Sequence, residues 1–173
     1  MLVSGKPNLR KAIEVLLYVA QRAPNLYNAL KCIYFADKLH LARYGSFIYG
    51  DEYVAMNYGA VPSAAFDLLK QVRGDGRTCL PIDPSEALGM DGYLIRPRRD
   101  ADLRMLSASE RECLDQAIAK YGDLTFADLR RVSHADPAYQ EADENAFISV
   151  EAIVRSIGDE DLFELLEDGE ESA

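Results

Sequence analysis

Apolar residues recur at helical spacing along the first quarter of the chain. Between residues 9 and 20 they lie three and four positions apart, which predicts an amphipathic helix that Asn8 caps. A second helix is expected to begin after Asn25 and to end at Gly45, a residue suited to a left-handed C-terminal cap. Because this second helix is apolar on nearly all sides, we expect it to be the buried central helix of the fold.

Two polar residues, Asp37 and His40, interrupt the apolar surface of the central helix. Their spacing allows them to contact each other, and their burial requires hydrogen-bonding partners. We interpret them as an internally satisfied polar pair, in which His40 donates to Asp37 or to a main-chain carbonyl. A catalytic dyad would need a nucleophile beside the pair, and the sequence identifies none.

The segment after the central helix is rich in β-branched and aromatic residues. Residues 47–59 are typical of a strand or a tight pair of strands, and Gly59 is expected to end this extended segment. Pro62 stands where a third helix would begin, and Gly74 is its expected end.

Turn-forming residues dominate positions 74–92, which we expect to form a long surface loop. Residues 93–106 are then expected to form a hairpin. Its first arm carries Leu94 and Ile95, and its second arm carries three apolar residues, Leu103, Met105 and Leu106.

Capping signals divide the C-terminal half into helices. Ser107 and Glu110 give the pattern of a capping box at the start of one helix, which Gly122 ends. Shorter helices are expected after three further capping residues, Thr125, Asp136 and Ser149. Together these patterns predict a mainly α (α+β) fold, a compact helical domain around a buried central helix with one small antiparallel β-sheet.

The net charge of −10 is concentrated at the C-terminal end of the 173-residue chain. Residues 159–173 hold eight acidic residues and no lysine or arginine, so the rest of the chain is nearly neutral. We expect a single globular domain over residues 1–158, followed by an acidic tail with a short amphipathic segment.

No basic footprint dominates the chain, so nucleic-acid binding is not expected. A local cluster of four arginines is found at Arg96, Arg98, Arg99 and Arg104. We interpret this cluster as a solvated, charge-protected sheet edge.

The absence of a long apolar run indicates that the chain does not cross a membrane, and the N-terminus lacks the apolar core of a signal peptide. A cytoplasmic protein with reduced thiols is expected, since its three cysteines, Cys32, Cys79 and Cys113, are odd in number and far apart. Neither a metal site nor a cofactor motif is expected from the two histidines and the glycine pattern. Ser133, His134 and Asp136 are too close in sequence to face one another as a catalytic triad.

Residues 31–70 combine a tyrosine-aspartate helix, a Gly-Asp turn and a YG-V-P start of the next helix. In this order they resemble the Panacea domain of SocA-like antitoxins, a family often found in phage-associated genes. The block SHADPAYQEA at residues 133–142 is similar to a second recurring block of that family, and the resemblance covers roughly residues 8–145. Two positions depart from the family pattern, Ala60 in place of a common proline and Tyr139 in place of a usual tryptophan.

The resemblance implies an antitoxin that neutralises a cognate toxin by direct protein–protein binding, without catalysis of its own. Some relatives are adaptors that deliver the toxin to a ClpXP-type protease, and this role is open here as well. We expect the partner-binding residues to be Tyr53, Asn57, Tyr58, Val61, Pro62, His134 and Tyr139.

Two other functions are alternatives. The first is a hydrolase or metal-dependent enzyme that uses Asp37 and His40, together with Asp51 and His134. The second is a DNA-binding autoregulator that uses the arginine-rich hairpin, for which strongly salt-dependent DNA binding is expected.

Overall fold

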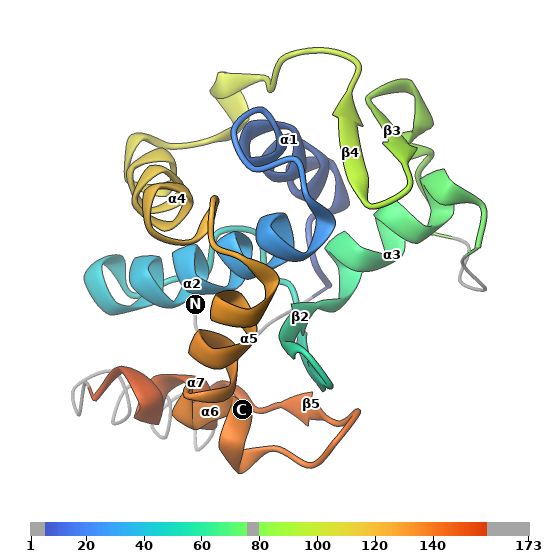
Figure 1. Ribbon diagram of the computed structural model, residues 1–173. Coiled ribbons are helices and arrows are strands. Elements are labelled where there is room, and N and C mark those ends of the chain that lie inside the picture. Colours follow the sequence, from blue (N-terminus) through green and yellow to red (C-terminus); the bar gives the residue numbers. More distant parts are fainter. Residues whose placement is uncertain (1–5, 76–79, 159–173) are drawn as a thin grey trace.

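Helix α2 (Leu26–Tyr44) runs through the middle of the protein in a computed structural model that describes residues 6–75 and 80–158. Helix α1 (Leu9–Ala20), helix α4 (Ala108–Tyr121) and helix α5 (Phe126–His134) lie around it, as Figure 1 shows. Most side chains of α2 are buried, including those of Ile33 and Leu41 at 0 % exposure. The prediction of a buried central helix is therefore confirmed.

The helix boundaries follow from caps that the local sequence supplies. Asn25 accepts a hydrogen bond from the amide of Tyr27 at the start of α2, and Gly45 ends the helix in the left-handed conformation with φ 74°. Asn8 caps α1 in the same way. At the start of α4 the capping box between Ser107 and Glu110 is complete, because each side chain accepts a hydrogen bond from the main-chain amide of the other residue.

A three-stranded antiparallel sheet follows α2. Strand β1 (Tyr53–Met56) lies between strand β2 (Gly59–Pro62) and the short strand β5 (Phe147–Ile148). The predicted pair of strands is present, but it is shorter than expected because residues 47–52 form no strand. Gly59 opens the second strand instead of ending the sheet, since it pairs with Met56 across the turn.

Helix α3 (Ser63–Arg73) begins directly after Pro62 and ends at Gly74, as the sequence predicts. The expected surface loop after it contains a 3₁₀ helix (Pro84–Glu86) and strand β3 (Leu88–Asp91). Strand β3 pairs with strand β4 (Leu94–Pro97) in a second sheet of two strands.

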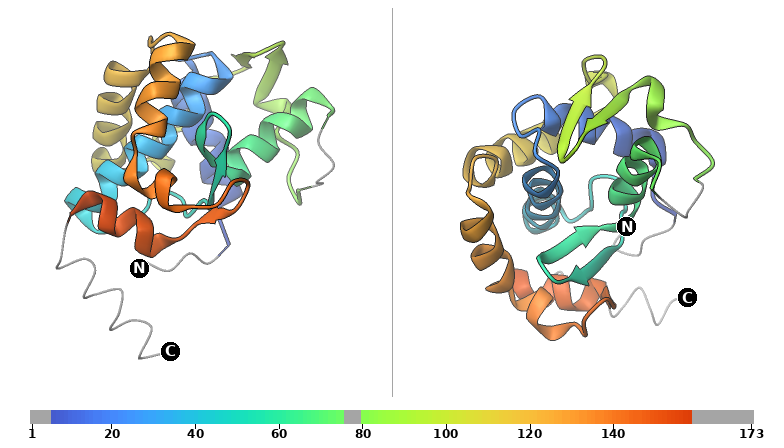
Figure 2. Two further views of the ribbon diagram at one scale, coloured as in Figure 1. Left: turned by 60° about the horizontal axis from the view of Figure 1, so that its bottom comes forward. Right: turned by 45° about the vertical axis from the view of Figure 1, so that its right-hand side comes forward.

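The predicted hairpin over residues 93–106 is wrong in its second arm. Residues Leu103–Met105 form a 3₁₀ helix, and β4 pairs with the preceding segment instead. The reason is burial, because Leu88 and Ile95 both reach 0 % exposure against the main core, whereas Leu103 is 49 % exposed. The two sheets lie on opposite sides of the molecule (Figure 2).

The last two helices, α6 (Pro137–Glu141) and α7 (Val150–Ile157), pack beside the three-stranded sheet. They share a second apolar cluster with Tyr34 and Leu41 of α2, separate from the main core around α1, α3 and α4. The mainly α fold with a small antiparallel sheet is confirmed, with the two-stranded sheet in addition. The predicted acidic tail lies outside the described residues. No helix in the described part is long and apolar enough to cross a membrane.

Candidate partner-binding surface

The tip of the β1–β2 hairpin is exposed and consists of Asn57 and Tyr58. The next residue, Gly59, has φ 114°, a conformation that residues with a side chain rarely adopt. A Cβ atom at this position would lie 2.4 Å from the Cβ atom of Ser133 in α5. Glycine is therefore required for both the turn and the close approach of the hairpin to α5.

The block at residues 133–142 forms the corner between α5 and α6, and Asp136 anchors it. The Asp136 carboxylate accepts a hydrogen bond from the amide of Tyr139 at the start of α6. It also accepts hydrogen bonds from the hydroxyl of Tyr34 and, at 2.5 Å, from the ammonium of Lys38, both in α2. The corner is thus fixed to the central helix by a buried, charge-assisted network.

His134 and Tyr139 then join this corner to the hairpin tip. Nε2 of His134 lies 2.7 Å from the carbonyl oxygen of Asn57, so this nitrogen carries the donated proton. The hydroxyl of Tyr139 donates to the carbonyl oxygen of Met56 at 2.7 Å. The two rings stack, with centroids 5.1 Å apart and an angle of 16° between their planes.

A surface depression of about 590 Å³ lies between the hairpin tip and the α5–α6 corner. Four of the seven residues predicted from the sequence line it, namely Asn57, Tyr58, His134 and Tyr139. The other three, Tyr53, Val61 and Pro62, are buried in strands β1 and β2 and do not line the depression. A direct role in partner binding stays a prediction for the four lining residues, of which Asn57 and Tyr58 are exposed and His134 and Tyr139 are half-buried.

Beside the depression lies a group of aromatic side chains that we call the aromatic patch, which consists of Tyr27, Tyr58, Tyr93 and Phe126. The ring of Tyr27 contacts the other three at centroid distances of 5.3 to 6.0 Å. Three of the rings are exposed, Tyr58 by 42 %, Tyr93 by 57 % and Phe126 by 45 %. The guanidinium of Arg130 lies over the Tyr58 ring at 5.8 Å.

Tyr27, Tyr93 and Phe126 are not among the partner-binding residues that the sequence predicts. One local signal was available, because each lies one or two positions after a capping or turn residue, where an aromatic side chain is not needed for an apolar stripe. Their convergence was not available, since they come from three different segments of the chain. The patch therefore emerges only from the tertiary structure.

The polar pair in α2 is architectural. Asp37 accepts hydrogen bonds from the amide of Ile48 at 2.7 Å and from the hydroxyl of Tyr53 at 2.6 Å. His40 uses Nδ1 to bond the carbonyl oxygen of Ser46 at 2.7 Å, which is one of the two expected arrangements. Both residues therefore fasten the connection between α2 and β1 to the central helix.

Burial changes the acidity of the Asp37 carboxyl. Desolvation raises its pKa to about 7, although the hydrogen bonds from Tyr53 and Ile48 lower the pKa in part. The nearby Asp51 and Glu110 raise it further. This carboxyl is fully buried and both of its oxygen atoms have partners.

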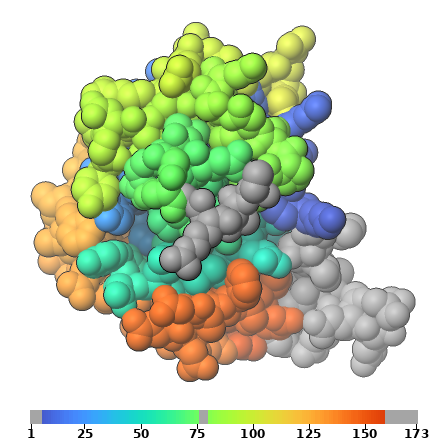
Figure 3. Space-filling model, turned by 90° about the vertical axis from the view of Figure 1, so that its right-hand side faces the viewer, coloured from blue at the N-terminus to red at the C-terminus, as the bar shows by residue number. Residues whose placement is uncertain are grey.

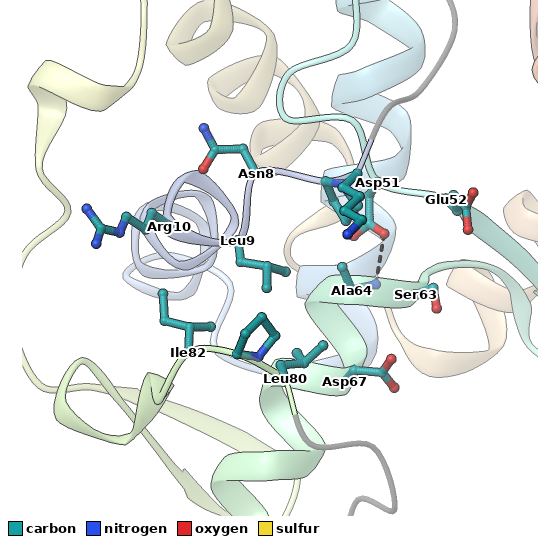
Figure 4. A pocket seen from close by; sticks show the side chains of 13 residues that line it. Asn8, Leu9, Arg10, Asp51, Glu52, Ser63, Ala64, Asp67, Leu80 and Ile82 are labelled. Atoms are coloured by element: carbon teal, nitrogen blue, oxygen red, sulfur yellow. Dashed lines mark hydrogen bonds between the residues drawn. The ribbon is translucent and has the colours of Figure 1, made fainter.

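Asp51 borders a wider cavity of about 640 Å³ between α1 and α3 (Figure 4). Its carboxylate accepts hydrogen bonds from the amides of Ala64 and Ala65 at 2.8 and 3.0 Å, so it caps α3. The hydroxyl of Tyr49 donates to the same carboxylate at 2.6 Å. Apolar side chains such as Leu9 and Ile82 form the cavity wall between the elements (Figure 4).

The residues of the enzyme alternative therefore serve separate structural contacts. Asp37 and His40 bond the α2–β1 connection, Asp51 caps α3 and His134 bonds the hairpin tip. Within the described ranges, no three histidine, cysteine, aspartate or glutamate side chains are grouped so that they could hold a metal ion. Cys32 and Cys113 are buried free thiols, and Cys79 lies outside the described residues.

Three of the four arginines in the cluster are paired with acidic side chains. Ion pairs link Arg99 to Glu14 at 2.6 Å and Arg104 to Asp102 at 3.0 Å, and Arg96 lies 3.4 Å from Asp91. The Arg99 pair also joins the segment after β4 to helix α1. These pairs reduce the positive field that a DNA-binding surface would need.

Comparison with known proteins gives one match. A family model described as "Antitoxin SocA-like, Panacea domain" matches residues 30–140. The matched range includes most of α2, the hairpin, and all but the last two residues of the block at 133–142. No curated protein and no solved structure matches the chain.

Proposed function

Because this chain belongs to the SocA-like antitoxin family with the Panacea domain, we propose that it neutralises a protein toxin by binding it directly. The surface that we assign to this contact is the depression at the hairpin tip together with the aromatic patch. Binding there needs no catalytic group. We expect the toxin to be the product of a neighbouring gene in the same cell, and both proteins to be cytoplasmic.

The observation that carries this proposal is the meeting of the two family-like blocks at one exposed surface. His134 and Tyr139 bond the main chain of the hairpin tip, so the two blocks present a single rigid face. Tyrosine and arginine are enriched at the energetic centres of protein interfaces, and this face carries Tyr58 and Arg130 in contact. A rigid aromatic surface loses little conformational entropy on binding.

A finer form of the proposal is delivery of the bound toxin to a ClpXP-type protease. In that case the antitoxin would act as an adaptor, and the toxin would be short-lived only in its presence. The test is the half-life of the toxin in cells with and without the protease. A toxin that is equally stable in both would leave steric neutralisation as the function.

Tyr58→Ala is expected to weaken toxin binding by roughly 30-fold or more, because truncation of a central interface tyrosine removes a large apolar contact. The measurement is calorimetric titration with the neighbouring gene product, together with rescue of growth on co-expression. Tyr44→Ala is the matched control, since Tyr44 is similarly exposed at 48 % but lies at the far end of α2. The control is expected to bind like the wild type.

The antitoxin function and the assigned binding surface can be contradicted separately. If the neighbouring gene product is neither toxic alone nor bound by this protein, the antitoxin function is lost. If the toxin is bound but Tyr58→Ala and Tyr44→Ala have equal affinity, the function stands and the assigned surface is wrong.

A further inference from the structure

A cavity of about 170 Å³ lies beneath the aromatic patch. Its wall is largely apolar, with Leu30 and Val61 among the lining residues, and Tyr27, Tyr58 and Tyr93 stand around it. Figure 3 shows this face of the molecule, where atoms of α2 lie at the bottom of a hollow between the hairpin, α3, α5 and the β3–β4 sheet. The cavity is therefore reached from the exposed side of the patch.

One cationic side chain from the protein interior lines this cavity. Lys31 is only 3 % exposed, and its ammonium donates to the carbonyl oxygen of Ala60 at 2.5 Å. An ammonium has three protons to donate, and Ala60 is its one hydrogen-bond partner among the described residues. Desolvation lowers the pKa of Lys31 to about 7, because burial penalises the charged form of the ammonium.

The charges around the cavity are of one sign. None of the described residues that line it is acidic. The other charged lining residue is Arg73, whose guanidinium is paired with Asp75 outside the cavity. A negatively charged group would therefore supply the counter-charge that Lys31 lacks, and its oxygen atoms would accept the free ammonium protons.

The size of the cavity limits the rest of the ligand. A dry cavity of about 150 Å³ lined by apolar side chains is known to hold a benzene molecule. A volume of about 170 Å³ therefore admits one six-membered ring or a branched chain of similar size, flanked by aromatic walls.

We propose that this cavity is a binding site for a small monocarboxylic acid whose apolar part is about the size of a benzene ring. The apolar part lies against the rings of Tyr27 and Tyr93, which line the cavity together, and the carboxylate accepts hydrogen bonds from Lys31. Because Tyr58 lines both this cavity and the depression at the hairpin tip, the site adjoins the assigned partner-binding surface. The inference does not depend on the antitoxin function, since the ligand binds the isolated chain.

The test uses benzoate and benzamide, which have nearly the same shape and differ in charge. Calorimetric titration of the full chain at pH 7 is expected to give saturable binding of benzoate, with a dissociation constant on the order of 1 mM for so small a ligand. Benzamide is expected to bind roughly tenfold more weakly, because it offers no negative charge. Acetate, which lacks the apolar part, is expected not to bind.

Lys31→Met keeps an unbranched side chain, one atom shorter than that of lysine, and removes the ammonium. In this variant the preference for benzoate over benzamide is expected to disappear, while benzamide binding changes by no more than about twofold. Lys70→Met, at a partly exposed lysine of α3 that does not line the cavity, is the matched control and should keep the preference.

A second measurement does not depend on the folding of any variant. Nuclear Overhauser contacts from the benzoate ring protons are expected to the ring protons of Tyr27 and Tyr93 in the wild-type protein. Equal affinities for benzoate and benzamide, no saturation by either at 20 mM (about twenty times the expected constant), or contacts only to other parts of the surface would each overturn the assignment.

Discussion

Asp37→Asn is expected to remove a large part of the pH dependence of stability in this protein. In the unfolded chain the carboxyl ionises near its ordinary pKa of 3.8, whereas burial raises its pKa to about 7 in the fold. Between these two values the unfolded state loses its proton first, so the free energy of unfolding falls as the pH rises. The contribution of Asp37 is complete below pH 3.8 and is lost above pH 7.

The expected magnitude is about 4 kcal/mol between pH 4 and pH 7, from the difference between the two pKa values. Asparagine does not titrate, and its amide can accept from the Ile48 amide and donate to the Tyr53 hydroxyl. Urea unfolding of the wild type and the variant at several pH values measures the effect. The variant is expected to be the more stable protein at pH 8.

Asp143→Asn is the matched control for this experiment, because Asp143 is exposed at the surface. Its free energy of unfolding is expected to follow that of the wild type at every pH. A constant difference between wild type and Asp37→Asn from pH 4 to pH 8 would show that the buried carboxyl does not retain its proton in the fold.

Gly59→Ala is expected to lower the free energy of unfolding by about 4 kcal/mol, the sum of backbone strain and overpacking. The strain arises from the φ of 114°, and the overpacking from a Cβ atom that would lie 2.4 Å from the Cβ of Ser133 and 3.0 Å from Nζ of Lys31. Relief of this contact requires the hairpin to move away from α5. The bond between His134 and Asn57 would then be lost, and toxin binding is expected to weaken as well.

Gly92→Ala separates the two causes. Gly92 also has a positive φ, of 60°, but a Cβ atom at this position meets nothing within 4 Å. This variant is expected to lose only about 1 kcal/mol, from the left-handed conformation alone. Urea unfolding measures both variants, and a loss at Gly59 as small as that at Gly92 would show that the hairpin is not held tightly against α5.

The helices and their ends were determined by the sequence itself. Asn8, Asn25 and Ser107 cap their helices through amides two or three positions further along the chain, and Gly45 ends α2 through its own backbone conformation. These interactions involve neighbours in sequence, so the residue types are enough to predict them. The same holds for the all-round apolar pattern that predicted the burial of α2.

Strand pairing was decided by the tertiary structure. Residues 88–91 and 103–106 both offer apolar side chains to β4, and only the packing of Leu88 and Ile95 in the main core selects the first segment. Alternation along a strand likewise does not tell which tyrosine is exposed. Tyr53 is buried because β1 is the central strand and its hydroxyl donates a hydrogen bond to Asp37, whereas Tyr58 lies at the tip of the hairpin.

The candidate partner-binding surface was also predicted only in part from the sequence. The sequence by itself named Asn57, Tyr58, His134 and Tyr139, because they belong to two recognisable blocks. Only the fold placed these blocks against each other, since the bond from His134 to Asn57 joins positions 77 residues apart. The aromatic patch and the cavity that Lys31 lines combine residues from still more segments of the chain. Local hydrogen bonds can be read along the chain, whereas contacts between distant segments depend on how the whole apolar core is buried.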